Sequence, residues 1–168
     1  MSGGVLVAGI GNIFLGDDGF GPEVARRLVA EPAGLPPEVR VVDYGIRGMH
    51  LAYDLLDGVD ALVLVDALPG PEPAGTLRVL EVGPDDVGSE PVDAHDLHPA
   101  AVLASLVAMG GALPPTFVVG CQPADMDEGI GLSDPVAAAV DGAAAAVHRL
   151  LADRLPAPAQ PAGHQRRS

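Results

Sequence analysis

The residues of this chain that could carry out chemistry are acids and histidines close to short apolar runs. Asp17 and Asp18 stand together in a glycine-rich segment, Asp66 directly follows an aliphatic run, and His95 lies in the sequence DAHDLHP. Two carboxylates and an imidazole would form a mixed oxygen and nitrogen ligand set for Zn, Ni or Mn, with positions left for water or substrate. Each residue also has a structural interpretation, because Asp66 could cap the following turn and His95 could be a surface histidine.

The glycine-rich segment GIGNIFLGDDGFGPE, residues 9–23, allows two functional interpretations. A dinucleotide fingerprint, Gly-x-Gly-x-x-Gly, fails at its third glycine, where Phe14 stands, and the adjacent acids Asp17 and Asp18 would repel a pyrophosphate. The alternative is a loop that presents a carboxylate to a metal or to a proton. A structural origin stays open as well, because the helix dipole favours acids in a first turn.

Composition excludes several classes of function. Acids outnumber bases by 23 to 9, and the formal charge of −14 argues against a nucleic-acid or anionic-membrane partner. All nine bases are Arg, so neither a Walker A lysine nor a Schiff base is available. A lone cysteine, Cys121, excludes an internal disulfide, and we expect it to lie in the core. No apolar run approaches the ~20 residues of a membrane helix and no signal peptide is recognisable, so we expect a cytoplasmic protein.

The apolar pattern predicts strands that alternate with helices, and hence a three-layer α/β domain with a mostly parallel sheet. The segment between residues 68 and 74 is too short for a parallel crossover helix, so the strand after it should be antiparallel or at an edge. The domain should span residues 1–155, followed by a disordered Pro/Ala-rich tail over 156–168. The predicted strands are 5–9, 39–43, 61–65, 76–82 and 116–121, and the predicted helices are about 21–30, 49–56, 99–109 and 133–151.

The carboxyl edge of this predicted sheet should collect the polar candidates. Asp17, Asp18, Asp43 and Asp66 all follow strands that we expect to be parallel, and His95 would arrive by a loop. Ligands in open α/β sheets bind at that edge, which makes it the expected position of the site.

Several motifs, in order, resemble the signature of the nickel–iron hydrogenase maturation proteases. The similarity covers nearly the whole chain before residue 156, and linked motifs are more specific than one glycine loop. The motifs are GIGN (9–12), GDDGFG (16–21), VVDYGIRG (41–48), LVLVDAL (62–68), DAHDLHP (93–99), VVGCQP (118–123) and GIGLSDPV (129–136).

The resemblance implies an endopeptidase, classed with aspartic-type peptidases, that removes a C-terminal extension from the precursor of the hydrogenase large subunit after nickel insertion. It implies an α/β/α sandwich of the phosphorylase/hydrolase-like type, with a five-stranded mixed sheet containing one antiparallel strand. It also implies that Asp18, Asp66 and His95 are the metal-binding and catalytic residues, and it leaves the role of Asp43 open. The metal would be nickel carried by the substrate, with no organic cofactor, and we expect a monomer.

The sequence departs from the family pattern at three places. Asp18 is shorter than the Glu of many members, Tyr44 replaces a Gly or Phe, and DAHD replaces a Ser-x-His sequence. These differences suggest a different hydrogenase partner, and none removes a ligand.

The mechanism stays open at this point. The metal could polarise the scissile carbonyl or supply a hydroxide, and Asp17 or Asp43 could act as general base. His50 and His98 are weaker candidates, for which we favour capping or surface roles. The competing function is a non-catalytic metal-binding or metallochaperone-like α/β protein, since a fold does not fix a function.

Overall fold

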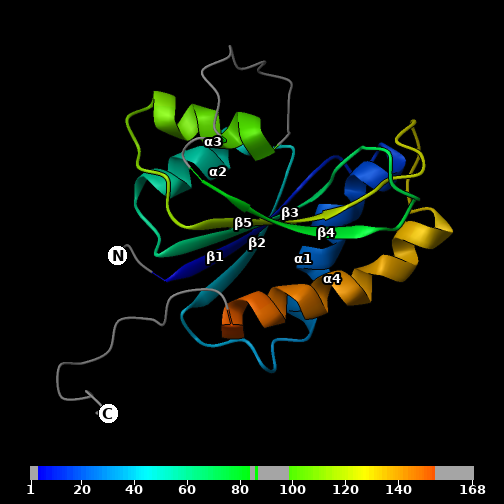
Figure 1. Cartoon of the computed structure of the whole chain (residues 1–168), viewed down its shortest axis with the longest axis horizontal. Coiled ribbons are helices and arrows are strands. Elements are labelled where there is room, and N and C mark those ends of the chain that lie inside the picture. Colours follow the sequence, from blue (N-terminus) through cyan, green and yellow to red (C-terminus); the bar gives the residue numbers. More distant parts are fainter. Residues whose placement is uncertain (1–3, 84–85, 87–98, 154–168) are drawn as a thin grey trace.

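The computed structural model describes residues 4–83, 86 and 99–153. Five strands form one sheet in the order β2-β1-β3-β5-β4, and only β4 is antiparallel to its neighbour. Figure 1 shows α2 and α3 on one face of this sheet and α1 and α4 on the other. The elements are β1 Val5–Ile10, the 3-10 helix η1 Gly16–Gly19, α1 Phe20–Ala30, β2 Val39–Gly45, α2 Gly48–Leu56, β3 Ala61–Ala67, β4 Leu77–Val82, α3 Pro99–Ala108, β5 Thr116–Cys121 and α4 Asp134–Asp153.

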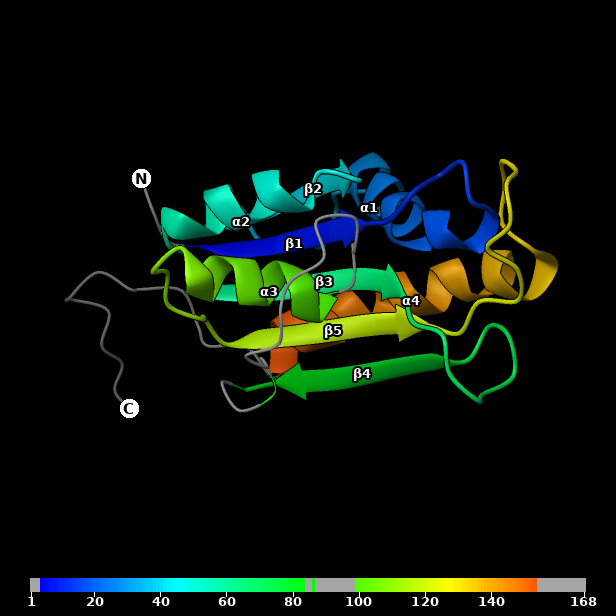
Figure 2. The same ribbon diagram turned by 90° about the horizontal axis from the view of Figure 1, so that it is seen from above.

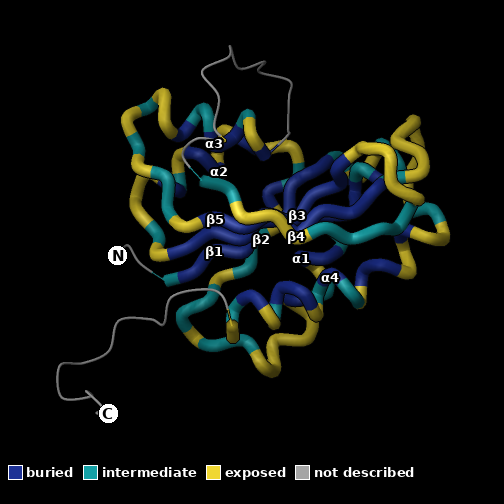
Figure 3. Tube along the Cα trace, in the orientation of Figure 1, coloured by how far each residue is buried: buried dark blue, intermediate teal, exposed yellow. Residues whose placement is uncertain are grey.

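The three central strands are buried along their full length, as their unbroken aliphatic sequences predict. Alternate side chains point to opposite faces, so Val7, Val63 and Phe117 pack under α1 and α4, whereas Leu6 and Leu62 pack under α2 and α3. The central strands appear as the dark blue layer in Figure 3. The predicted three-layer α/β/α sandwich, with an antiparallel fourth strand, is therefore confirmed.

The connection from β1 into α1 depends on close backbone approach. A Cβ at Gly21 would collide with the carbonyl oxygens of Ile10 and Val65, so only glycine lets the first turn of α1 lie against the ends of β1 and β3. This approach places the segment from Gly11 to Gly19 over the carboxyl edge of the sheet.

Most predicted boundaries agree with the structure to within two residues. One difference matters for the site, because β3 continues through Asp66 to Ala67 and the acid is part of the buried strand. His95, His98 and the predicted tail over 156–168 lie outside the described residues. Within the described ranges, no helix is long and apolar enough to cross a bilayer.

Candidate functional site

Asp17 and Asp18 occupy η1, directly after β1, and they have opposite environments. The Asp17 side chain is fully buried. Its Oδ1 accepts a hydrogen bond from Ser133 N at 2.7 Å, and its Oδ2 accepts from Ala124 N at 2.8 Å, Asp125 N at 3.1 Å and Ser133 Oγ at 2.8 Å. Burial acts to raise the pKa of Asp17, but the donors from Ser133, Ala124 and Asp125 outweigh it, so the pKa is lowered. Asp17 is an ionised structural anchor.

This arrangement overturns one mechanistic hypothesis. A general base must reach a proton on substrate or water, and the oxygens of Asp17 are enclosed and already accept four hydrogen bonds. The hypothesis that Asp17 acts as the general base is therefore wrong. The sequence did not reveal its partner Ser133, whose hydroxyl donates to Asp17, although the motif GIGLSDPV contains that serine.

Backbone hydrogen bonds join the same two loops. Gly16 N donates to Gly129 O at 2.8 Å, Gly129 N donates to Phe14 O at 2.9 Å, and Asp17 N donates to Asp125 O at 2.9 Å. Gly16 has a positive φ of 55°, and a Cβ there would lie 2.8 Å from Asp125 O, so the junction requires glycine. Residues 11–19 and 122–133 thus form one unit, which we call the double loop. Both of its segments lie at the carboxyl edge of the sheet in Figure 2.

Asp18 is only partly buried and is less constrained. Within the described residues its carboxylate accepts one hydrogen bond, from Asn12 N to Oδ2 at 2.9 Å. Burial raises the pKa of Asp18, and the bond from Asn12 offsets only part of that effect. A partly buried carboxylate with few donors is stabilised by a positive charge nearby, so the Asp18 side chain could accept a metal ion as a partner.

Asp66 lies near the end of β3, beside Gly120 of β5, and is 4% exposed. Its Oδ1 accepts a hydrogen bond from Ala67 N at 2.8 Å. Since η1 contacts β3, Asp18 and Asp66 come from neighbouring elements at one edge of the sheet. His95 is outside the described residues, and the described part of the chain contains no group of three His, Cys, Asp or Glu side chains that could hold a metal.

Asp43 follows the same edge on β2. Its side chain is exposed, and its Oδ1 accepts a hydrogen bond from Gly45 N at 2.9 Å. Arg47 fixes the turn after it by donating to the backbone oxygens of Asp43 and Tyr44 at 2.9 and 3.1 Å. Asp43 is therefore held in place by its backbone while its carboxylate remains open to solvent.

Tyr44, one of the departures from the family pattern, belongs to the core. It is 1% exposed under α2, and its hydroxyl donates to Asp54 Oδ2 at 2.6 Å. His50, on α2, places its ring centroid 6.0 Å from that of Tyr44 and its Nε2 3.8 Å from Asp54 Oδ1. The His50 side chain is exposed on α2, in agreement with a surface role, and Tyr44 contributes to packing.

Cys121 is fully buried at the end of β5. Burial, helped by the negative charge of Asp17, raises the pKa of the Cys121 thiol to about 11. A thiol of this kind is not ionised at neutral pH and does not act as a nucleophile. The expectation that Cys121 is a core residue is confirmed.

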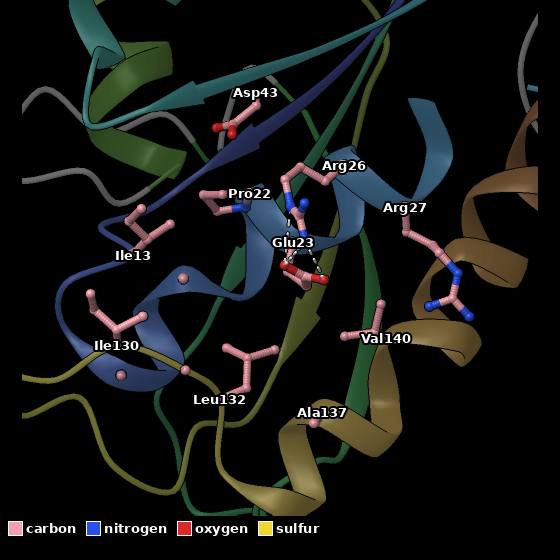
Figure 4. A pocket seen from close by; sticks show the side chains of 13 residues that line it. Ile13, Pro22, Glu23, Arg26, Arg27, Asp43, Ile130, Leu132, Ala137 and Val140 are labelled. Atoms are coloured by element: carbon pink, nitrogen blue, oxygen red, sulfur yellow. Dashed lines mark hydrogen bonds and ion pairs between the residues drawn. The ribbon is translucent and has the colours of Figure 1, made fainter. Parts of the chain in front are cut away.

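A pocket of about 480 Å³ opens beside the double loop, between α1 and α4 (Figure 4). Its apolar lining comes from both helices and from both loops, and Asp43 and the ion pair Glu23–Arg26 also line it. The sequence did not indicate this pocket, because its lining residues are distant in the chain and follow no single periodicity. The lining residues are Ile13, Gly16, Gly19, Pro22, Glu23, Arg26, Arg27, Asp43, Ile130, Gly131, Leu132, Ala137 and Val140.

Comparisons with known proteins agree with this fold. The family model for hydrogenase maturation protease matches residues 22–150. The hydrogenase expression/formation protein HupD of Rhodobacter capsulatus is 34% identical over 152 residues, which cover 88% of this chain and 70% of that protein.

Solved structures are similar over almost the whole chain. The hydrogenase maturating endopeptidase HybD of Escherichia coli superposes with a TM-score of 0.73 at 28% identity, covering 96% of this chain and 99% of that one. The hydrogenase 2 maturation peptidase of a Thaumarchaeota archaeon has a TM-score of 0.67 at 30% identity, covering 88% and 97%. The chain therefore belongs to the hydrogenase maturation protease family, the endopeptidases that process the precursor of a hydrogenase large subunit.

Proposed function

We propose that this protease removes the C-terminal extension of a nickel–iron hydrogenase large-subunit precursor only after nickel has been inserted. Asp18, Asp66 and His95 would recognise the nickel, which arrives as part of the substrate. The observation that best supports this assignment is the difference between the adjacent acids of η1. Asp17 accepts four hydrogen bonds, whereas Asp18 accepts one from the residues that the structure describes and lies on the element that contacts β3.

The donor set fits a divalent ion. Asp18 and Asp66 offer carboxylate oxygens from neighbouring elements of a rigid sheet edge, and His95 offers an imidazole, a ligand type that suits nickel. Three protein ligands leave positions for the groups that already hold the ion in the precursor. A precursor without nickel would lack this handle and would bind poorly, so the site would act as a sensor of nickel insertion.

Asp43 is the acid best placed to serve as general base. It is exposed and lines the pocket, and only Gly45 N donates to its carboxylate within the described residues. In this role it would accept a proton from a water whose oxygen bonds to the scissile carbonyl carbon. The C–N bond then breaks, and the proton passes to the leaving amine.

The direct test is incubation of the protein with its precursor, loaded with nickel or free of it, followed by mass measurement of both precursors. We expect the loaded precursor to lose the mass of its extension and the nickel-free one to remain intact. Equal cleavage of both would overturn nickel sensing, and an intact loaded precursor would favour the non-catalytic, metallochaperone-like alternative. Fractionation of cells and measurement of the solution mass would test our further expectations of a cytoplasmic monomer.

A further inference from the structure

We propose that the pocket between α1 and α4 is a specificity subsite that seats an apolar side chain of the precursor's C-terminal segment. This inference rests on the proposed function, because it assumes that such a segment reaches the carboxyl edge of the sheet. The occupant should be a neutral or basic stretch of chain that carries at least one large apolar residue.

The lining has the composition of a side-chain pocket. Pro22, Leu132 and Val140 supply apolar walls, and Ala137 lies on the first turns of α4 where a larger residue would fill the space. Ile13 and Ile130, one from each loop, lie at the same end of the pocket in Figure 4. The volume of about 480 Å³ is within the range of ~300–1,000 Å³ that small-ligand pockets occupy, and it accommodates a short peptide stretch.

The mouth of the pocket exposes apolar surface to solvent. Ile13 is 49% exposed and Ile130 is 78% exposed, and both belong to the double loop. The Asp17 anchor fixes the backbone of this loop before any ligand arrives. A preformed apolar mouth lowers the ordering cost of binding, because the loops need not be immobilised when the segment enters.

The pocket is continuous with the proposed catalytic edge. Two of its lining residues, Gly16 and Gly19, are the ends of η1 and enclose Asp17 and Asp18 in the sequence. Asp43, the proposed base, is also part of the lining. A chain whose scissile bond lies near Asp18 and Asp43 therefore has a neighbouring residue within reach of the pocket.

Charge decides which segment fits. Arg26 donates to Glu23 Oε1 at 3.0 Å. Arg27 forms an ion pair with Asp141, and the Nε of Arg27 lies 3.9 Å from Glu31 Oε2. The two cations at the pocket are thus neutralised within the protein, whereas the described residues supply no ion-pair partner for the Asp43 carboxylate. An acidic segment would meet uncompensated negative charge, so a neutral or basic one is favoured.

The test is a variant that fills the pocket, Ala137→Phe, beside its matched control Ala138→Phe. Both alanines are exposed on α4, but only Ala137 lines the pocket. With nickel-loaded precursor, Ala137→Phe should raise KM about tenfold or more with little change in kcat, because it removes binding of a remote side chain. Ala138→Phe should leave both constants unchanged, and both variants should keep the wild-type thermal midpoint.

A second variant, Ile130→Ser, removes the most exposed residue of the mouth without touching the core, and it should also raise KM. A parallel measurement titrates each protein with a synthetic peptide of the precursor's C-terminal extension and follows fluorescence anisotropy. Wild type and Ala138→Phe should bind this peptide more tightly than Ala137→Phe.

The outcomes separate this inference from the proposed function. Processing by wild type with equal KM for Ala137→Phe would overturn the pocket and leave the function intact. Peptide binding that weakens in Ala137→Phe, without any processing by wild type, would overturn the function and support the pocket. Absence of both would overturn both. A dimer of wild type that Ile130→Ser converts to a monomer would identify a second copy of the chain as the occupant and refute the proposal.

Discussion

The two acids of η1 are neighbours in the sequence and differ in almost every physical respect. Asp17 faces the loop between β5 and α4. Three backbone amides and the Ser133 hydroxyl of this loop donate to its carboxylate and lower the pKa of Asp17. Asp18 faces the start of its own loop, its pKa is raised by burial, and among the described residues its carboxylate accepts one hydrogen bond, from Asn12 N. One acid holds the double loop in place, and the other is left poorly solvated at the edge where β1 and β3 end.

This difference shows how a short acidic motif can serve both structure and chemistry. Neighbouring residues of a tight helical turn point in different directions, so Asp17 reaches the loop from Ala124 to Ser133 whereas Asp18 reaches Asn12. The stabilised acid fixes the loop that carries the unstabilised one. A site built this way remains organised without metal, and binding of the metal ion is not needed for folding.

The largest expected effect is a loss of activity, without a loss of stability, when Asp18 or another proposed metal ligand is replaced. Asp18→Asn, Asp66→Asn and His95→Ala should each abolish processing of nickel-loaded precursor, a loss beyond about 100-fold, since even residues that only orient ligands contribute 10–100-fold. The thermal midpoint of the first variant should stay level or rise slightly, because its carboxylate is desolvated. Full processing by the Asp66 and His95 variants, measured by mass, would refute the site.

The opposite pattern is expected for Asp17→Asn, which should lose stability because the buried carboxylate anchors the double loop. The amide keeps one acceptor oxygen and turns its donor toward the amides of Ala124 and Asp125. Buried donors that lose a charged acceptor cost ~1–3 kcal/mol each, so we expect a loss of about 3 kcal/mol or more in the free energy of unfolding, measured by urea titration.

The pH dependence checks the same anchor. The pKa of Asp17 is lowered in the folded state from its ordinary value of 3.8, so its stabilisation is present above that value and is lost as the pH falls. The gap in unfolding free energy between wild type and Asp17→Asn should therefore narrow below pH 3.8. A gap that stays constant through this window would mean that the ionised carboxylate is not the stabilising form.

A smaller effect is expected when only the side-chain donor to Asp17 is removed. Ser133→Ala deletes the hydroxyl bond of 2.8 Å and keeps the backbone bond of 2.7 Å, which should cost about 1–2 kcal/mol of unfolding free energy. Ser105→Ala is the control, since the Ser105 hydroxyl donates to Ala101 O within α3. Equal urea midpoints for the two variants would show that the serine contributes nothing to the anchor.

The sequence predicted the fold well, because its signals are local. The aliphatic runs of β1, β3 and β5 and the short 68–74 connection specify a buried parallel core with an antiparallel fourth strand. The topology also placed Asp18, Asp43 and Asp66 at one edge of the sheet. Each of these inferences needs only periodicity, connection length and the rule that parallel strands end together.

What the sequence could not show depends on contacts between distant residues. The family resemblance named Asp18 as the ligand, but the physical reason that Asp17 is the buried acid lies in its bond to Ser133, 116 residues away. The pocket likewise requires α1, α4 and two loops to meet. No local sequence pattern encodes contacts between such distant segments. Because Asp17 and Asp18 have identical side chains, residue propensities cannot distinguish them.

The smallest expected effect concerns Cys121, which lies on the structural side of the comparison near Asp17. Cys121→Ala should process nickel-loaded precursor within about twofold of wild type and lose only about 1 kcal/mol of stability, since the buried thiol fills space and performs no chemistry. Burial raises the thiol pKa from 9.0 to about 11, so the unfolded chain ionises first as the pH rises. Wild type should therefore lose stability relative to Cys121→Ala between pH 9 and 11. Urea unfolding of both proteins at pH 9 and at pH 11 measures this change. A difference in unfolding free energy that is the same at both pH values, or a variant without processing activity, would show that the thiol has a role beyond packing.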